Sequence, residues 1–226
     1  MTKRRQPLGQ TIGGVLFGFE QQVFRNAPPP HELVHHARPD ASVAAGDGTM
    51  LTIGMPGDDV NRRTAMTDMQ LREVSGQRTV AVRVQAPMAE VDIAALCGRY
   101  LPLVGDRLGS AGIAPAGAPF VRYHRWGGDE ADVEIGIPVS DIPVGLAPLA
   151  DVQAGEPGVS SLPAGLAGVA MYVGPYTGLS ATYDALHEWI HAQGHDEGRG
   201  PWESYVDDPE GADPATVRTE VIWLVA

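Results

Sequence analysis

The spacing of hydrophobic residues along the chain changes between the two-residue period of a strand and the roughly 3.6-residue period of a helix. From residue 76 onward, these strand-like and helix-like segments follow one another in a fixed order. Val80, Val82 and Val84 alternate with other residues, which predicts a strand with one apolar face. A run of apolar residues at helical spacing follows, and two further alternating runs are separated by glycine-containing turn residues. The predicted elements of this first unit are a strand at 78–85, a helix at about 91–111, and strands at 119–125 and 132–139.

A second unit repeats this order after a linker, residues 140–158, that is rich in proline, glycine and alanine. Residues 120–123 correspond to 202–205, and residues 133–139 correspond to 219–225. The repeat predicts an α+β fold in which two tandem β-α-β-β units form one antiparallel sheet, with the helices on one face and a ligand cleft on the other. The predicted elements of the second unit are a strand at 166–173, a helix at about 177–193, and strands at 202–206 and 216–225.

Two glutamates lie inside strands that otherwise have the composition of a sheet core. Glu203 shares one face of its strand with Tyr205, and Glu220 shares one face of its strand with Ile222. Burying such a carboxylate without a partner is costly. The alternative is that both glutamates point to solvent on an edge strand, as most glutamates are exposed. If both glutamates line the cleft, Val221 and Trp223 point toward the helices, and the first unit adds Tyr123, Glu134 and Trp126.

Residues 1–75 differ in pattern and are expected to form an accessory N-terminal segment, with the ligand-binding domain at 76–226. The segment has short helical patterns at 15–24 and 31–36 and a strand pattern at 49–55. It has no helix-turn-helix pattern, and its three neighbouring histidines, His31, His35 and His36, are a weak metal signal that is expected to belong to a surface helix.

Charge and cysteine content exclude some classes of function. A net charge of −12 and a pI near 4.9 argue against a nucleic-acid partner and favour cationic ligands. The single cysteine, Cys97, is expected to be a buried apolar residue. The basic and apolar N-terminus lacks a signal-peptide cleavage site, and no apolar run reaches the roughly 20 residues of a membrane span. We therefore expect a cytoplasmic protein with no membrane partner.

His187-Glu188-Trp189-Ile190-His191 matches the H-E-x-x-H pattern of zinc enzymes. In that chemistry the histidines are ligands, Glu188 is the base, and His195 or Glu197 is the third ligand. The helical phase argues against it, because both histidines lie on the flank of the predicted buried stripe and Glu188 lies opposite. The stripe consists of Leu179, Tyr183, Leu186 and Ile190. We therefore expect a solvated helix face, with no metal and no cofactor.

Several spaced elements of the second unit resemble one known family. They are Gly174-Pro175-Tyr176, residues 183–189, Gly194, residues 200–205, residues 208–210 and Arg218-Thr219-Glu220. The chain here is similar to the GyrI-like small-molecule-binding domains, which also serve as effector-binding domains of multidrug-responsive bacterial transcription activators. The first unit matches more loosely, mainly at 132–139, and the first 75 residues have no counterpart.

The resemblance implies a stand-alone multidrug-binding protein that takes up bulky hydrophobic aromatic, preferably cationic, compounds. Glu203 would be the buried charge partner and Glu220 a second acid, while aromatic faces would stack on the ligand. Two alternatives stay open: a hydrolase of cyclopropane-bearing alkylating natural products with Glu203 as general base, and a gyrase-inhibitor-like protein-interaction module. The expected ligand-binding residues are Glu203, Glu220, Tyr205, Tyr123, Glu134, Trp126, Met171, Tyr176 and Ile222.

Overall fold

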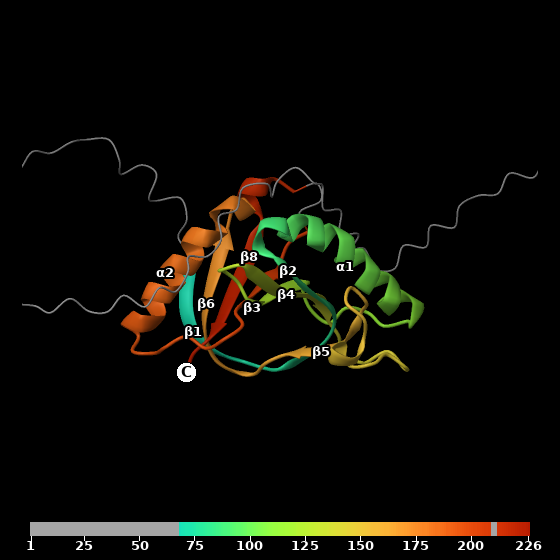
Figure 1. Cartoon of the computed structure of the whole chain (residues 1–226). Coiled ribbons are helices and arrows are strands. Elements are labelled where there is room, and N and C mark those ends of the chain that lie inside the picture. Colours follow the sequence, from blue (N-terminus) through green and yellow to red (C-terminus); the bar gives the residue numbers. More distant parts are fainter. Residues whose placement is uncertain (1–67, 209–211) are drawn as a thin grey trace, which may run out of the picture.

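Eight strands form one antiparallel sheet, and two helices lie together on one of its faces (Figure 1). A computed structural model describes residues 68–208 and 212–226 of the chain. The predicted α+β class, the antiparallel sheet and the placement of both helices on one face are confirmed. The elements are β1 (Asp68–Val74), β2 (Gln77–Pro87), α1 (Ile93–Ser110), β3 (Phe120–Arg125), β4 (Glu130–Pro138), β5 (Gly158–Leu162), β6 (Gly165–Val173), α2 (Leu179–Ala192), β7 (Trp202–Tyr205) and β8 (Arg218–Leu224).

The strand order β1-β6-β8-β7-β3-β4-β2-β5 places the two repeat units side by side. One unit is β2-α1-β3-β4, the other is β6-α2-β7-β8, and β3 pairs with β7 at the seam between them. Val121 and Glu203 occupy equivalent positions in the repeat and face each other directly across this seam. Glu203 therefore lies where the two halves of the molecule meet.

The sequence analysis did not predict the two edge strands. β1 pairs with β6 at one edge of the sheet, and β5 pairs with β2 at the other. β1 falls in a stretch that we treated as accessory, and β5 begins at the end of the linker rich in proline and glycine. The helix and strand patterns at 15–24, 31–36 and 49–55 lie outside the described residues. None of the helices in the described part of the chain is both long enough and apolar enough to cross a membrane.

Both helices bury one apolar stripe against the sheet, as their sequence spacing predicts. In α1 the side chain of Asp92 caps the first turn by accepting a hydrogen bond from the backbone N–H of Ala95. In α2 the predicted stripe is confirmed, and Gly194 ends the helix at a φ of 84° that favours glycine. The buried residues of α2 are Leu179, Thr182, Tyr183, Leu186 and Ile190.

Apolar side chains lie on both faces of the sheet. On the helix face they include Val121, Val221 and Ile135, which belong to one core together with the helices. On the opposite face Phe120 and Trp202 belong to a smaller apolar cluster that also contains Ile222. Each central strand thus has one face toward the helices and one face away from them, and this alternation decides which surface each candidate site residue reaches.

The close contact between α2 and β6 depends on Gly168. A Cβ atom at this position would lie 2.6 Å from Cγ1 of Ile190, which is fully buried. We expect Gly168→Val to lower the free energy of unfolding by about 1–3 kcal/mol, because the added atoms overpack this contact. Urea unfolding followed by circular dichroism measures the change.

Gly105→Ala is the matched control, because a Cβ at Gly105 within α1 meets nothing within 4 Å. This variant should gain about 0.4–1 kcal/mol in the free energy of unfolding. Equal stability of Gly168→Val and the wild type would show that α2 does not pack on β6 at this distance.

Candidate functional site

Glu203 is a buried carboxylate at the centre of the sheet, and its side chain faces the helices. It is 5% exposed and pairs with Val121 of β3 and Val221 of β8, both of which belong to the core under the helices. Cross-strand partners point to the same side of a sheet, so Glu203 lies on the helix face. Its burial is as expected, but the predicted position in a cleft on the face opposite the helices is wrong, because the pairing with Val121 and Val221 turns this side chain toward the helices.

Three tyrosine hydroxyls donate hydrogen bonds to this carboxylate. The hydroxyls of Tyr123 and Tyr183 donate to Oε1 at 3.0 Å and 3.2 Å, and the hydroxyl of Tyr205 donates to Oε2 at 2.8 Å. The donors come from β3, α2 and β7, so both repeat units and one helix contribute. We call the four residues Tyr123, Tyr183, Glu203 and Tyr205 the tyrosine cage.

Burial controls the protonation of the tyrosine cage. Desolvation raises the pKa of Glu203 above its usual value of 4.5, and the three tyrosine hydrogen bonds offset only part of that effect. Burial and the nearby carboxylate also raise the pKa values of Tyr123, Tyr183 and Tyr205 well above 10, so these hydroxyls stay protonated and donate. Burial thus makes the Glu203 carboxyl easier to protonate than an exposed glutamate, while three protonated hydroxyls remain to donate to its ionised form.

Further aromatic rings surround the tyrosine cage with edge-to-face contacts. The ring of Trp126 lies 5.1 Å from that of Tyr123, and the ring of Tyr176 lies 5.6 Å from that of Tyr205. Trp223 contacts the ring of Tyr183 at 6.0 Å, which confirms that Trp223 points toward the helices. These contacts place a negative site inside an aromatic shell, an arrangement that suits a cation with apolar substituents.

Cys97 of α1 lies in the same interior region. It is 1% exposed, and burial together with the charge of Glu203 raises the pKa of its thiol. The prediction of a buried cysteine is confirmed, and a raised thiol pKa disfavours the thiolate form that acts as a nucleophile.

Glu220 does not accompany Glu203, and the prediction that both glutamates line one cleft is wrong. Glu220 pairs with Ser204, the neighbour of Glu203 along β7, so it points to the face away from the helices. There it forms an ion pair of 2.9 Å with Arg72 of β1. It borders an open groove of about 220 Å³ that is also lined by Arg72, Trp202, Ser204 and Ile222.

The other predicted residues divide between the two faces in the same way. Met171 pairs with Glu220, and Glu134 pairs with Arg122 on the face away from the helices. Glu134 is 2% exposed and lies 2.8 Å from Nε2 of His124. The predicted residues near Glu203 are Tyr123, Tyr205, Trp126 and Tyr176, and those on the opposite face are Glu134, Met171, Glu220 and Ile222.

Two residues of this region were not predicted to bind ligand: Tyr183, which belongs to the tyrosine cage, and Trp223, whose ring contacts it. Tyr183 was assigned to the buried stripe of the helix, and its spacing with Leu179 and Leu186 is equally typical of core packing. Trp223 was placed correctly toward the helices but was not connected with Glu203. The missing information was the register of β7 against β8, which pairs Glu203 with Val221.

Comparison with known proteins gives one family and one fold. A family model described as a GyrI-like small molecule binding domain matches residues 67–226. The crystal structure of the EcmrR C-terminal domain matches at 23% identity and a TM-score of 0.58, over 71% of this chain and 98% of that one. A search of curated proteins found no match.

Two further structures share the fold. The EcmrR chain in a cryo-EM complex with DNA matches at 23% identity and a TM-score of 0.56, over 71% of this chain and 57% of that chain. A hydrolase from Listeria innocua matches at 12% identity and a TM-score of 0.50, over 75% of this chain and 97% of that one. At these identities the structures establish the fold alone.

The raised pKa of Glu203 predicts a specific dependence of stability on pH. The folded protein binds this proton more tightly than the unfolded chain does, so the free energy of unfolding falls as pH rises from about 4.5 through the folded-state pKa. Each unit of raised pKa corresponds to about 1.4 kcal/mol. Glu203→Gln cannot ionise, so we expect the wild type to lose stability relative to this variant between pH 4.5 and pH 8.

Urea unfolding at a series of pH values measures the difference between the two profiles. Glu188→Gln, on the exposed side of α2, is the control and should follow the wild-type profile. Parallel profiles for the wild type and Glu203→Gln would contradict a raised pKa at Glu203.

Proposed function

Because this chain belongs to the GyrI-like family of small-molecule-binding domains, we propose that it binds bulky aromatic cations at the tyrosine cage. The observation that carries the proposal is the environment of Glu203. In residues 68–208 and 212–226, its hydrogen-bond partners are three neutral tyrosines, and no lysine, arginine or histidine forms an ion pair with it. A ligand cation would supply the positive charge that the protein does not.

The chemistry of the site favours a lipophilic cation over a small hydrated one. A cation whose charge is spread over aromatic groups loses little hydration on entering an apolar site, so the carboxylate gains a partner at low desolvation cost. The rings of the cage and of Trp126, Tyr176 and Trp223 offer faces for stacking and cation–π contact. The net charge of −12 adds a long-range attraction for cations.

Access to Glu203 would be from the side of the half-buried tryptophans. Trp126 and Trp223 are partly exposed, whereas Tyr123 and Tyr183, whose rings they contact, are buried. Rotation of the tryptophan side chains would open the aromatic shell without breaking a strand pairing. Motion at this level is common in binding sites that accept ligands of different shapes.

The raised pKa of Glu203 also supports a second candidate function, hydrolysis. A carboxylate whose pKa moves toward neutrality is a better general base, and three hydrogen bonds fix its orientation. The resemblance to this family implies hydrolysis of cyclopropane-bearing alkylating compounds as the alternative. In this chain a water near Glu203 would add to the bound ring while one strained ring C–C bond breaks, and the proton of the water would pass to the Glu203 carboxylate. Binding and hydrolysis use the same carboxylate, so only turnover separates them.

We expect a rhodamine-type cation to bind the wild-type protein with micromolar affinity. Binding to Glu203→Gln should be at least tenfold weaker, a loss of about 1.4 kcal/mol or more, because the ligand loses its charge partner. Fluorescence titration of both proteins measures the affinities, and a neutral analogue of similar shape should show little difference between them.

Glu220→Gln is the matched control, because it removes a carboxylate from the opposite face of the sheet. Its affinity for the cation should equal that of the wild type. An equal loss in Glu203→Gln and Glu220→Gln would contradict a site on the helix face. Conversion of more than one equivalent of an electrophilic ligand by the wild type, but not by Glu203→Gln, would instead support the hydrolase.

A further inference from the structure

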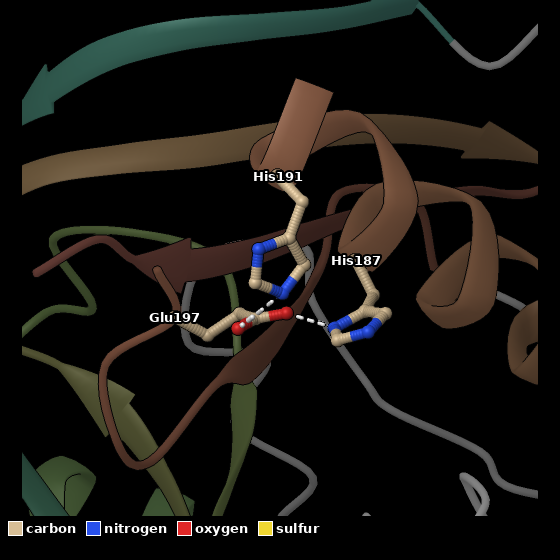
Figure 2. A group of neighbouring side chains, drawn as sticks. All are labelled: His187, His191 and Glu197. Atoms are coloured by element: carbon tan, nitrogen blue, oxygen red, sulfur yellow. Dashed lines mark ion pairs between the residues drawn. The ribbon is translucent and has the colours of Figure 1, made fainter. Parts of the chain in front are cut away.

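A second cluster of polar side chains lies at the end of α2, outside the tyrosine cage. His187 and His191 project from successive turns of α2 toward the carboxylate of Glu197 (Figure 2). Glu197 belongs to the loop that joins α2 to β7. The ring of Trp223 lies 6.3 Å from that of His187 and 6.0 Å from that of Tyr183, so this indole is near both the cluster and the tyrosine cage. The cluster uses none of the residues to which we assign ligand binding.

The three side chains converge on one point. Nδ1 of His187 contacts one carboxylate oxygen of Glu197, and Nε2 of His191 lies 3.1 Å from the other. One potential ligand atom from each residue lies within 4.8 Å of the other two. Nδ1 of His187 and Oε1 of Glu197 are buried and face each other, and neither has a hydrogen bond to any other atom in the described part of the chain. Either a proton shared by the two atoms or a metal ion bound by both can satisfy such a pair.

The backbone holds this arrangement in place. The i, i+4 spacing puts both histidines on one side of α2, and Gly194 turns the chain back along the helix. Residue 197 then pairs with Val225, and the N–H of Gly198 donates to the carbonyl of Leu224 at 2.7 Å. The indole of Trp223 also donates to the carbonyl of Gly198 at 2.8 Å. Glu197 is therefore fixed against the end of β8, with a side-chain exposure of 12%.

We propose that His187, His191 and Glu197 form a zinc-binding site. Two imidazole nitrogens and a carboxylate are a common zinc ligand set, and ligands about 2.1 Å from one zinc ion lie no more than about 4.2 Å apart. The observed cluster needs only a small side-chain adjustment to meet that limit. Imidazole ligands favour zinc and similar transition metals over magnesium or calcium, which prefer oxygen ligands.

The surroundings of the cluster favour a structural role for the metal over a catalytic one. Nδ1 of His191 lies 3.7 Å from Oδ1 of Asp196, and a carboxylate at that position can orient a zinc-binding histidine. Glu188, the base in the enzyme pattern H-E-x-x-H, is exposed and does not belong to the cluster. Zinc would thus fasten the last turn of α2 to the end of β8, without the catalytic geometry of a zinc peptidase.

Isothermal titration of the chelator-treated full chain with zinc chloride at pH 7.5 tests the proposal. We expect one equivalent to bind with micromolar or tighter affinity and to raise the melting temperature. Glu197→Gln and His191→Ala should each weaken zinc binding at least tenfold and remove the rise in melting temperature. Cobalt(II), used as a spectroscopic probe, should give the absorption of a tetrahedral site in the wild type only.

Two control variants separate this site from other histidines. His195→Ala changes a histidine of the same loop that lies outside the cluster, and zinc binding should be unchanged. A variant with His31, His35 and His36 all replaced by alanine should also keep one tight equivalent. Circular dichroism checks that Glu197→Gln, which is close to isosteric, is folded.

Two outcomes would overturn the proposal. Absence of zinc binding to the wild type would show that the cluster is a histidine–carboxylate ion pair alone. Zinc binding that survives in both Glu197→Gln and His191→Ala would place the metal elsewhere. Neither outcome bears on cation binding at Glu203, which is measured separately with a dye and without metal.

Discussion

The structure of the candidate site depends on the burial of one carboxylate at the seam between two repeat units. Removing a carboxylate from water costs several kcal/mol, and a hydrogen bond to a charged group returns about 1.5–3 kcal/mol. Glu203 receives three such bonds, and its pKa is nevertheless raised, so the hydrogen bonds do not fully replace water. The protein therefore keeps a negative site that a positively charged ligand can satisfy further.

The internal repeat explains how a single carboxylate gains partners from both halves of the molecule. Tyr123 and Tyr205 are equivalent in the repeat, and they donate to different oxygens of Glu203, Tyr123 across the seam and Tyr205 from the same strand. The position equivalent to Glu203 is Val121, which avoids a second carboxylate directly opposite the first. The helices differ too, because the fifth residue of α1 is Cys97 while the fifth residue of α2 is the donor Tyr183. The fold is thus close to symmetric, but the site is not.

The sequence predicts the elements well because each depends on local spacing. All six strands and both helices of the two repeat units lie within a few residues of their predicted positions. The edge strands β1 and β5 were missed, since a short edge strand depends on its neighbour more than on its own residues. The prediction that Glu203 and Tyr205 share one face of their strand was also correct, because alternation within one strand is a local property.

Relations between distant segments could not be predicted in the same way. The register of β7 against β8 decides that Glu203 and Glu220 face opposite sides, and a shift of one residue would have reversed this result. The cluster of His187, His191 and Glu197 could not be predicted for the same reason, because it also depends on how distant segments lie together. The helical phase of the two histidines was predicted, but the turn at Gly194 and the pairing of residue 197 with Val225 bring the carboxylate to them.

The most direct test of this account is the pKa of Glu203 itself, measured by carbon-13 NMR of its carboxyl carbon, with Glu203→Gln used to assign the signal. In the free protein we predict a pKa above the ordinary 4.5, because burial outweighs the three tyrosine hydrogen bonds. A saturating lipophilic cation should lower that pKa, since a positive charge beside the carboxylate favours its ionised form. An ordinary pKa that does not change when the cation binds would show that Glu203 is neither desolvated nor the charge partner of the ligand.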